Sequence, residues 1–230
     1  AIVFSSLFLA VTIKMIEINL LYTEKGNYFV ESVETKRANI LDRNKTSLTA
    51  NLLTSHISVN PKAVYDKKKF ISKVSAINNR FSTTDLDKLV SEKKFFWLDR
   101  NVEPSELQKY IDLGETGIEF RDAYKRKYLH SELFSHLVGK VDIDNTGVSG
   151  LEKSFNKFLQ NEENNDLILS LDTRIQHIVR DEILAAMKLY KATGGSGLIM
   201  NVNNGEILAM TSLPDFDPNT KNANDNDKFN

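Results

Sequence analysis

The amino-acid sequence predicts an α+β fold, and three observations support this prediction. Apolar residues recur at helical spacing within residues 70–77 and again within residues 86–90. A longer amphipathic segment, residues 173–190, follows Asp172, a residue type that caps helix N-termini. Asn204-Gly205 then separates two apolar segments, and this dipeptide is the strongest short-range signal of a β-hairpin because both turn residues need a positive φ.

Composition bounds the class of protein. The 230 residues are 41% hydrophobic and 27% charged, which is enough apolar material for one or two packed domains. The net charge of -1 argues against the broad basic surface that binding to a polyanion needs, so nucleic acid is not an expected partner. The absence of cysteine excludes disulfides, thiolate chemistry and zinc sites with cysteine ligands.

The first residues form an uncharged apolar segment. Ala1 to Ile13 contain no charge, and Lys14 and Glu17 follow. A membrane helix needs about 20 mostly apolar residues, so this segment is too short to span a bilayer as it stands. We interpret residues 1–21 as a truncated membrane anchor; a buried helix and the apolar region of a signal peptide are the alternatives.

Short strands are predicted after a polar connector at residues 23–37. Residues 40–41, Leu48 and residues 56–59 carry the apolar character of strands, and Asn60-Pro61 ends the last of them.

Helices are predicted to follow these strands. Thr83-Thr84-Asp85 is a plausible N-cap run for the helix at residues 86–90, and Glu103-Pro104-Ser105 opens another short helix. The irregular mixture up to about Phe158 indicates an α+β domain without a repeated unit.

A polar stretch at residues 160–165 is the best candidate for a domain boundary. The helix after it is expected to end at Gly194-Gly195, and residues 198–202 and 206–210 form the predicted hairpin. Both strands are apolar on both faces, so we expect a sheet that is covered on each side, with the helix as one cover. The helix face predicted to pack inward comprises Ile175, Val179, Ile183, Ala186, Met187 and Tyr190.

Six segments resemble the sequence boxes of class B penicillin-binding proteins, in the family's order. Residues 37–44 resemble the box R-G-x-I-x-D-R-N-G that opens the pedestal, or dimerisation, domain; Ala38 and Lys45 stand where the family has glycine. Lys45 must therefore accept a turn conformation that glycine enters freely. The second segment, Arg126-Lys127-Tyr128, resembles the family's R-x-Y-P, with Leu129 in place of the proline. The other segments are residues 136–139 (H-x-x-G), residues 147–152 (G-x-x-G-L-E), residues 169–176 and residues 204–219.

The resemblance implies an organisation and a location. Residues 22–160 would form the pedestal domain, and residues 161–230 the first helix and β-hairpin of an incomplete penicilloyl-serine-transferase domain. A single N-terminal helix would cross the cytoplasmic membrane, with the bulk of the chain on the outer side. Expected partners are the membrane, membrane proteins of the division complex and, for the full-length protein only, peptidoglycan stem peptides; no cofactor or metal is expected.

Family resemblance also selects motif residues, which are expected to be structural rather than catalytic. They are Arg37, Asp42, Arg43, Arg126, Gly139, Gly147, Gly150, Glu152, Asp172, Gln176, Gly205, Glu206 and Pro218.

The resemblance implies acyl transfer by a serine, but the required boxes do not occur in family order. Ser91 and Ser154 each begin a Ser-x-x-Lys match and Ser58 a Ser-x-Asn match, yet all three lie in the pedestal region and no Lys-Thr-Gly follows. We interpret them as chance matches. Residues 142–147 resemble the start of a calcium loop, but Lys153 replaces its last ligand.

Two functions are consistent with the sequence. The first is the N-terminal portion of a septal peptidoglycan D,D-transpeptidase, inactive alone because the nucleophile lies beyond Asn230. The amino-acid sequences of residues 147–152 and 212–216 resemble those of the division enzymes more than those of the elongation enzymes. The alternative is a non-enzymatic, membrane-anchored interaction module of the division complex.

Overall fold

The computed structural model describes residue 4 and residues 8–15, 36–78, 80–92, 94–161, 163 and 165–220. The chain divides into two compact units, Ala1–Val33 and Glu34–Asn230.

In the first unit, residues 8–15 are helical, and their side chains are exposed. No described helix is both long and apolar enough to cross a lipid bilayer. The predicted anchor at residues 1–21 lies largely outside the described residues and stays a prediction.

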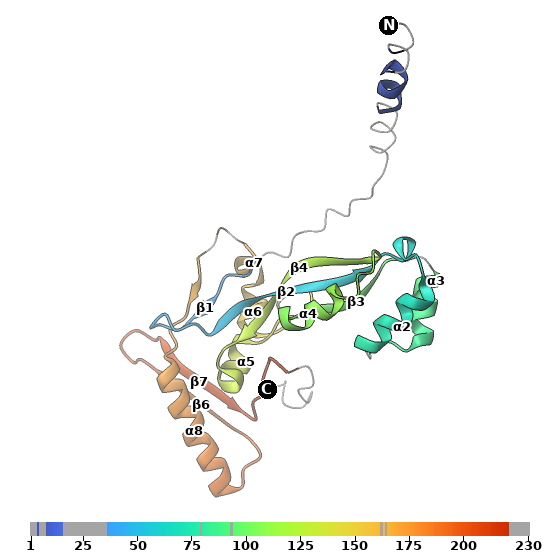
Figure 1. The fold of residues 1–230 in the computed structure, drawn as a ribbon. Coiled ribbons are helices and arrows are strands. Elements are labelled where there is room, and N and C mark those ends of the chain that lie inside the picture. The colour runs from blue at the N-terminus through green and yellow to red at the C-terminus, as the bar shows by residue number, and fades with distance from the viewer. Residues whose placement is uncertain are drawn as a thin grey trace. The chain divides into compact units, whose positions relative to one another are not determined.

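The second unit contains a three-stranded antiparallel sheet with the order β3-β2-β4 (Figure 1). Strand β2 (Thr49–Val59) is central, between β3 (Phe96–Val102) and β4 (Ile118–Tyr128). Strands β2 and β4 pair without interruption from Thr49↔Tyr128 to Val59↔Ile118. The strand predicted at residues 56–59 is therefore the end of a much longer strand.

Three helices pack against this sheet, and polar side-chain caps, Asp66 and Ser82, begin the first two of them. Helix α2 (Lys67–Ile77) follows a short 3-10 turn, η1 (Pro61–Ala63), and α3 (Thr83–Ser91) and α4 (Pro104–Ile111) follow α2. Ser82 caps α3 and forms a capping box with Asp85, so the predicted cap was one residue too late. The helices and the sheet share a buried core that comprises Ile57, Val59, Val64, Phe70, Ile71, Val74, Leu86, Val90, Leu98, Val102, Tyr110 and Ile118.

A second core lies where the pedestal segments meet the region after residue 160. Strand β1 (Ile40–Leu41) pairs in parallel with β5 (Leu167–Ile168). Four short helices follow β4 in the chain: η2 (Ser131–Phe134), α5 (Ser135–Val138), α6 (Gly150–Ser154) and α7 (Asn156–Leu159). Residues of η2, α5 and α7 pack in the same core as β1. The core contains Ile40, Leu48, Tyr128, Leu133, Phe134, Val138, Leu159 and Leu171. Segments on both sides of residue 160 thus pack together, and the domain boundary there stays a prediction.

Helix α8 (Thr173–Tyr190) packs against the hairpin of β6 (Gly195–Met200) and β7 (Ile207–Leu213). Asp172 caps the helix, as predicted, by accepting the backbone N–H of Arg174. The helix ends before the predicted Gly194-Gly195, because Lys191 takes the left-handed conformation at its C-terminus with φ 52°. The residue of the turn with positive φ is Gly205 (φ 76°), and Asn204 is not among such residues.

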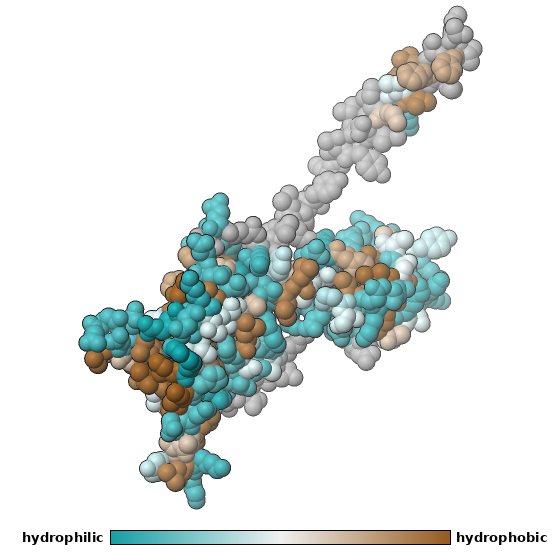
Figure 2. Space-filling view, turned by 60° about the vertical axis from the view of Figure 1, so that its left-hand side comes forward, coloured by the Kyte–Doolittle hydropathy of each residue, from teal (hydrophilic) through white to brown (hydrophobic). Residues whose placement is uncertain are grey.

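The predicted burial of these elements is only partly correct. Within α8, Val179 is buried and Ile183 and Met187 are partly buried, as predicted, but Ala186 and Tyr190 are exposed. In the hairpin, Leu198 and Met200 are 53% and 50% exposed, so the sheet is covered on one side only. Hydrophobic residues gather on this part of the surface (Figure 2).

Candidate functional site

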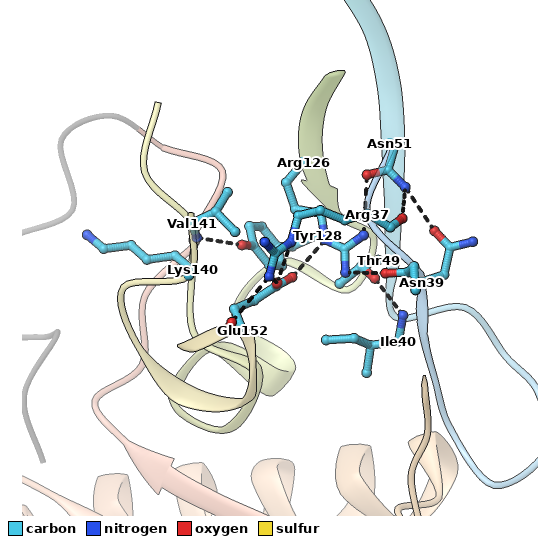
Figure 3. A network of polar contacts seen from close by, with 12 residues as sticks. Arg37, Asn39, Ile40, Thr49, Asn51, Arg126, Tyr128, Lys140, Val141 and Glu152 are labelled. Carbon is cyan, nitrogen blue, oxygen red and sulfur yellow. Dashed lines mark hydrogen bonds and ion pairs between the residues drawn. The ribbon is translucent and has the colours of Figure 1, made fainter. Parts of the chain in front are cut away.

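Three motif residues from distant parts of the chain meet in one buried cluster (Figure 3). Arg37 precedes β1, Arg126 lies on β4, and Glu152 lies on α6. Arg37 donates through Nη2 and Nε to Glu152 Oε2, at 2.7 and 3.1 Å. Arg126 donates through Nε to the other carboxylate oxygen, Oε1, at 2.7 Å. The three side chains are fully buried, so this single carboxylate joins a loop, a strand and a helix.

The cluster holds two positive charges and one negative charge, and neutral oxygen atoms satisfy the remaining donors. Arg37 also donates to the backbone oxygen of Asn145 and to Oδ1 of Asn156, both at 2.8 Å. Arg126 donates to the backbone oxygen of Ala38 at 3.0 Å. Buried guanidinium groups need such acceptors because desolvating a charge is costly.

Three motif glycines let the Glu152 helix approach its neighbours closely. A Cβ at Gly139 would lie 2.1 Å from the backbone oxygen of Ser149, and one at Gly150 would lie 2.5 Å from that of Leu137. A Cβ at Gly147 would lie 1.9 Å from the backbone oxygen of Glu152. The spacing H-x-x-G and G-x-x-G-L-E is therefore explained by backbone contact, which any side chain would prevent.

Tyr128 continues the cluster along β4. Its hydroxyl accepts the backbone N–H of Val141 at 2.9 Å. Its backbone N–H donates to Oδ1 of Asn219, and its backbone oxygen accepts from Nδ2 of Asn219. Burial, together with the nearby negative charge of Glu152, raises the pKa of the Tyr128 phenol. The phenol thus stays neutral and serves as a hydrogen-bonding group.

A second polar contact links the box at residues 37–44 to the start of α8. Asp42 is buried and accepts both the hydroxyl and the backbone N–H of Thr173. Asp172 accepts from Nδ2 of Asn44 at 3.0 Å and from Arg174 at 2.7 Å. Hydrogen bonds from Arg174 and Asn44 lower the pKa of Asp172, so this helix cap is charged at neutral pH.

The other motif residues connect α8, the hairpin and the loop after it. Gln176 is fully buried and binds the backbone of Met210 through both amide atoms. Arg43 and Glu206 form a half-exposed ion pair at 3.5 Å. Gly205 occupies the hairpin turn, and Pro218 lies in the loop beside Tyr128.

Several contributors to these contacts were not among the sequence-predicted residues. Asn51 donates to the backbone oxygen of Arg37, and Asn156, Thr173 and Asn219 complete the contacts described above. Thr173 and Asn219 belong to the segments at residues 169–176 and 204–219 that resembled family boxes, so the resemblance could have identified them. Asn51 and Asn156 carry no local pattern that could have identified them.

The geometry does not support catalysis by the chance serine matches. Ser91 and Ser154 are exposed at the ends of α3 and α6, and Lys157 lies on a different short helix, α7. Ser58 is fully buried in β2. Within the described residues, no three histidine or acidic side chains are placed to share a metal ion. The buried cluster can therefore hold segments together, but its charged groups offer no open position to a substrate.

Comparisons with known proteins agree with this arrangement. Residues 32–170 match the family described as "Penicillin-binding Protein dimerisation domain". The probable peptidoglycan D,D-transpeptidase FtsI of Caulobacter vibrioides is 29% identical over 198 residues, which are 85% of this chain and 34% of that protein. The chain thus spans about a third of this relative's length.

Solved structures show the same fold. Penicillin-binding protein PBP2 of Helicobacter pylori aligns with a TM-score of 0.57 and 26% identity, over 80% of this chain and 43% of that one. A second structure, of PBP2 in complex with MreC from the same organism, aligns with a TM-score of 0.58 and 24% identity, over 80% and 43%. The chain therefore belongs to the penicillin-binding protein dimerisation-domain family, and its homologues are class B peptidoglycan D,D-transpeptidases.

Proposed function

We propose that this chain is the pedestal and the first part of the transpeptidase domain of a division-type peptidoglycan D,D-transpeptidase. Such an enzyme cross-links septal cell wall by acyl transfer from D-Ala-D-Ala stem peptides. The observation that carries this proposal is that three family boxes, at residues 37–44, 126–128 and 147–152, converge on one carboxylate, Glu152. The chain's own role is to support and position the catalytic domain.

The proposal also includes a continuation of the transpeptidase domain and a membrane anchor. The exposed apolar side chains of Leu198, Met200 and Val202 on β6 and the following turn are the kind of surface that further sheet strands cover. We propose that the reading frame continues past Asn230 into a Ser-x-x-Lys box, and that the apolar N-terminal residues belong to an anchor in the cytoplasmic membrane, with the rest of the chain outside.

Depletion of the full-length gene product tests the division role. Cells that lack a septal transpeptidase are expected to grow as filaments without septa, whereas loss of an elongation enzyme is expected to produce rounded cells that still divide. Restoration by the full-length gene is the control. Rounded, dividing cells would contradict the septal assignment but leave the family membership untouched.

The alternative proposal is a non-enzymatic interaction module. Its support is that a protein of the same fold, PBP2 of Helicobacter pylori, was crystallised with MreC, so a pedestal of this kind can be part of a protein complex. The two proposals differ in one prediction. If the full-length gene with alanine at the serine of its Ser-x-x-Lys box still restores septation, the essential role is interaction; if it fails although the protein accumulates normally, the role is catalytic.

A further inference from the structure

A groove of about 840 Å³ with a mixed polar and apolar lining lies beside the buried cluster. The ends of β3 and β4 form one side, and residues 140–148 and 218–220 form the other. Its basic lining residues are Arg80, Arg100, Lys125, Arg126, Lys127 and Lys140. The acidic ones are Asp99 and Asp142, so the lining carries an excess of positive charge.

Most of this positive charge is already neutralised by neighbours. Arg126 is bound to Glu152, as described above. Arg100 pairs with Asp144 at 2.6 Å, and Lys125 pairs with Glu103 at 3.2 Å. Lys127 and Lys140 have no ion-pair partner within the described residues, although both are only partly exposed. Arg80 likewise has no ion-pair partner within the described residues and lies over the Phe81 ring, so the uncompensated charge is carried by these two lysines and Arg80.

The fold holds the two lysines near one another. Lys127 precedes Tyr128 on β4, and Lys140 precedes Val141, whose N–H binds the Tyr128 hydroxyl at 2.9 Å. The Lys140 side chain points away from the Arg37–Glu152 cluster (Figure 3). Two lysines that line one groove suit a ligand that carries more than one carboxylate.

The rest of the lining offers hydrogen-bonding groups that suit a hydroxyl-rich ligand. Asn78, Asn101, Asn219 and Thr220 supply amide and hydroxyl groups to the groove. Such groups can pair with the hydroxyl groups of a carbohydrate.

We propose that this groove binds a carboxylate-bearing glycan strand, with Lys127 and Lys140 as the residues that take its carboxylates. The choice of a cell-wall polymer as the ligand rests on the proposed function. The presence of the groove and its positive charge do not depend on that proposal.

Binding of soluble, uncross-linked peptidoglycan strands to the full chain tests this proposal. Fluorescence anisotropy of labelled strands should show saturable binding that weakens as salt rises, since charges on a surface are screened. The variant K127A/K140A should raise the Kd about tenfold. The variant K62A/K109A removes two lysines outside the groove lining and should bind like the wild type, and K127R/K140R should retain binding because it keeps the charge. Circular dichroism shows whether each variant is folded.

Two further probes decide the ligand class. Neutral chitooligosaccharides should bind at least about tenfold more weakly than the carboxylated strands, because they lack the groups that pair with the lysines. Absence of strand binding to the wild type, equal binding by folded K127A/K140A, equal binding of the neutral sugar, or full competition by poly-glutamate would each overturn the proposal. Strand binding is measured on this chain alone and the division role on cells, so either can fail without the other.

Discussion

Asp42 binds Thr173 through a single carboxylate oxygen, Oδ2, which accepts the hydroxyl at 2.8 Å and the backbone N–H at 3.2 Å. The other oxygen accepts the backbone N–H groups of Asn44 and Thr46, both at 2.8 Å. Burial by itself raises the pKa of Asp42, but the hydrogen bonds from Thr46, Thr173 and Asn44 outweigh it and leave the pKa below its usual value. The junction between the first family box and α8 thus depends on a charged carboxylate.

Acid is therefore expected to weaken this junction. Because the folded-state pKa of Asp42 lies below the unfolded value of about 3.9, its contribution is complete above pH ~4 and is lost as the pH falls through the folded-state pKa. The variant D42N should lower the free energy of unfolding at pH 7 by about 1–3 kcal/mol. Below pH 4, the free energy of unfolding of D42N should decrease less with falling pH than that of the wild type. Urea denaturation at pH 7, 4 and 3 measures both effects. An unchanged pH dependence in D42N would contradict this assignment.

Removal of the charge on Glu152 should be the most damaging single change in the pedestal. E152Q leaves Arg37 and Arg126 buried without a counter-charge, and breaking such a contact costs about 3–5 kcal/mol. E103Q is the matched control, because Glu103 pairs with Lys125 at the surface and such pairs contribute about 0–1 kcal/mol. Chemical denaturation of the three proteins gives the comparison. Equal stability of E152Q and E103Q would show that the buried cluster does not hold the segments together.

Lys45 occupies a position that the family fills with glycine, and its φ of 63° is in the left-handed region. That conformation costs a residue with a side chain about 1–2 kcal/mol, whereas glycine enters it freely but loses more entropy on folding. K45G is expected to stabilise the chain by about 1 kcal/mol. K62G, at a position that is not among the described residues with positive φ, should destabilise it by up to about 1 kcal/mol. Thermal denaturation distinguishes the signs, and a lower melting temperature for K45G would refute the argument.

The rings of His130 and His177 lie in a T-shaped arrangement, with their centroids 6.5 Å apart. Burial first, and the nearby His177 second, lower the pKa of His130, against smaller opposing effects from Ser47 and Asp42. H177Q should therefore raise the pKa of His130, while burial still holds it below the usual value. NMR titration of the His130 ring protons measures this change.

The histidine pair also has a consequence for stability. Since the folded-state pKa of His130 lies below its unfolded value of about 6.5, the unfolded chain binds protons more readily as the pH falls below that value. Stability should thus decrease between pH 7 and pH 5, and less steeply in H177Q. A His130 pKa that does not move in H177Q would exclude the proposed electrostatic coupling.

Local sequence patterns predicted the helices better than the sheet. The cap at Asp172 and the Glu103-Pro104 helix start are local signals, and both were confirmed. Strands β3 and β4 carried no clear signal because they are the two edges of the sheet, where charged side chains such as Lys125 and Lys127 are common. The end of α8 was misplaced because Lys191 took the left-handed conformation that glycine usually supplies.

The buried cluster could be predicted only in part. Family boxes identified Arg37, Arg126 and Glu152 as motif residues, but no spacing in the sequence indicates that they share one carboxylate. Asn145 and Asn156 accept hydrogen bonds from Arg37. Their positions depend on the fold of the neighbouring segment, in which the three motif glycines make close backbone contacts. Contacts of this kind form between segments more than 100 residues apart, where hydrophobic periodicity carries no information.

A fluorescent penicillin provides the most direct test of the claim that this chain supports acyl transfer without performing it. After incubation with the folded chain and denaturing electrophoresis, the account predicts no covalent label, because neither Ser91 nor Ser154 has the surroundings of a nucleophile. A longer product of the gene that contains a Ser-x-x-Lys box after residue 230 should be labelled under the same conditions. Stoichiometric label on the folded 230-residue chain, absent when the chain is denatured beforehand, would contradict the account.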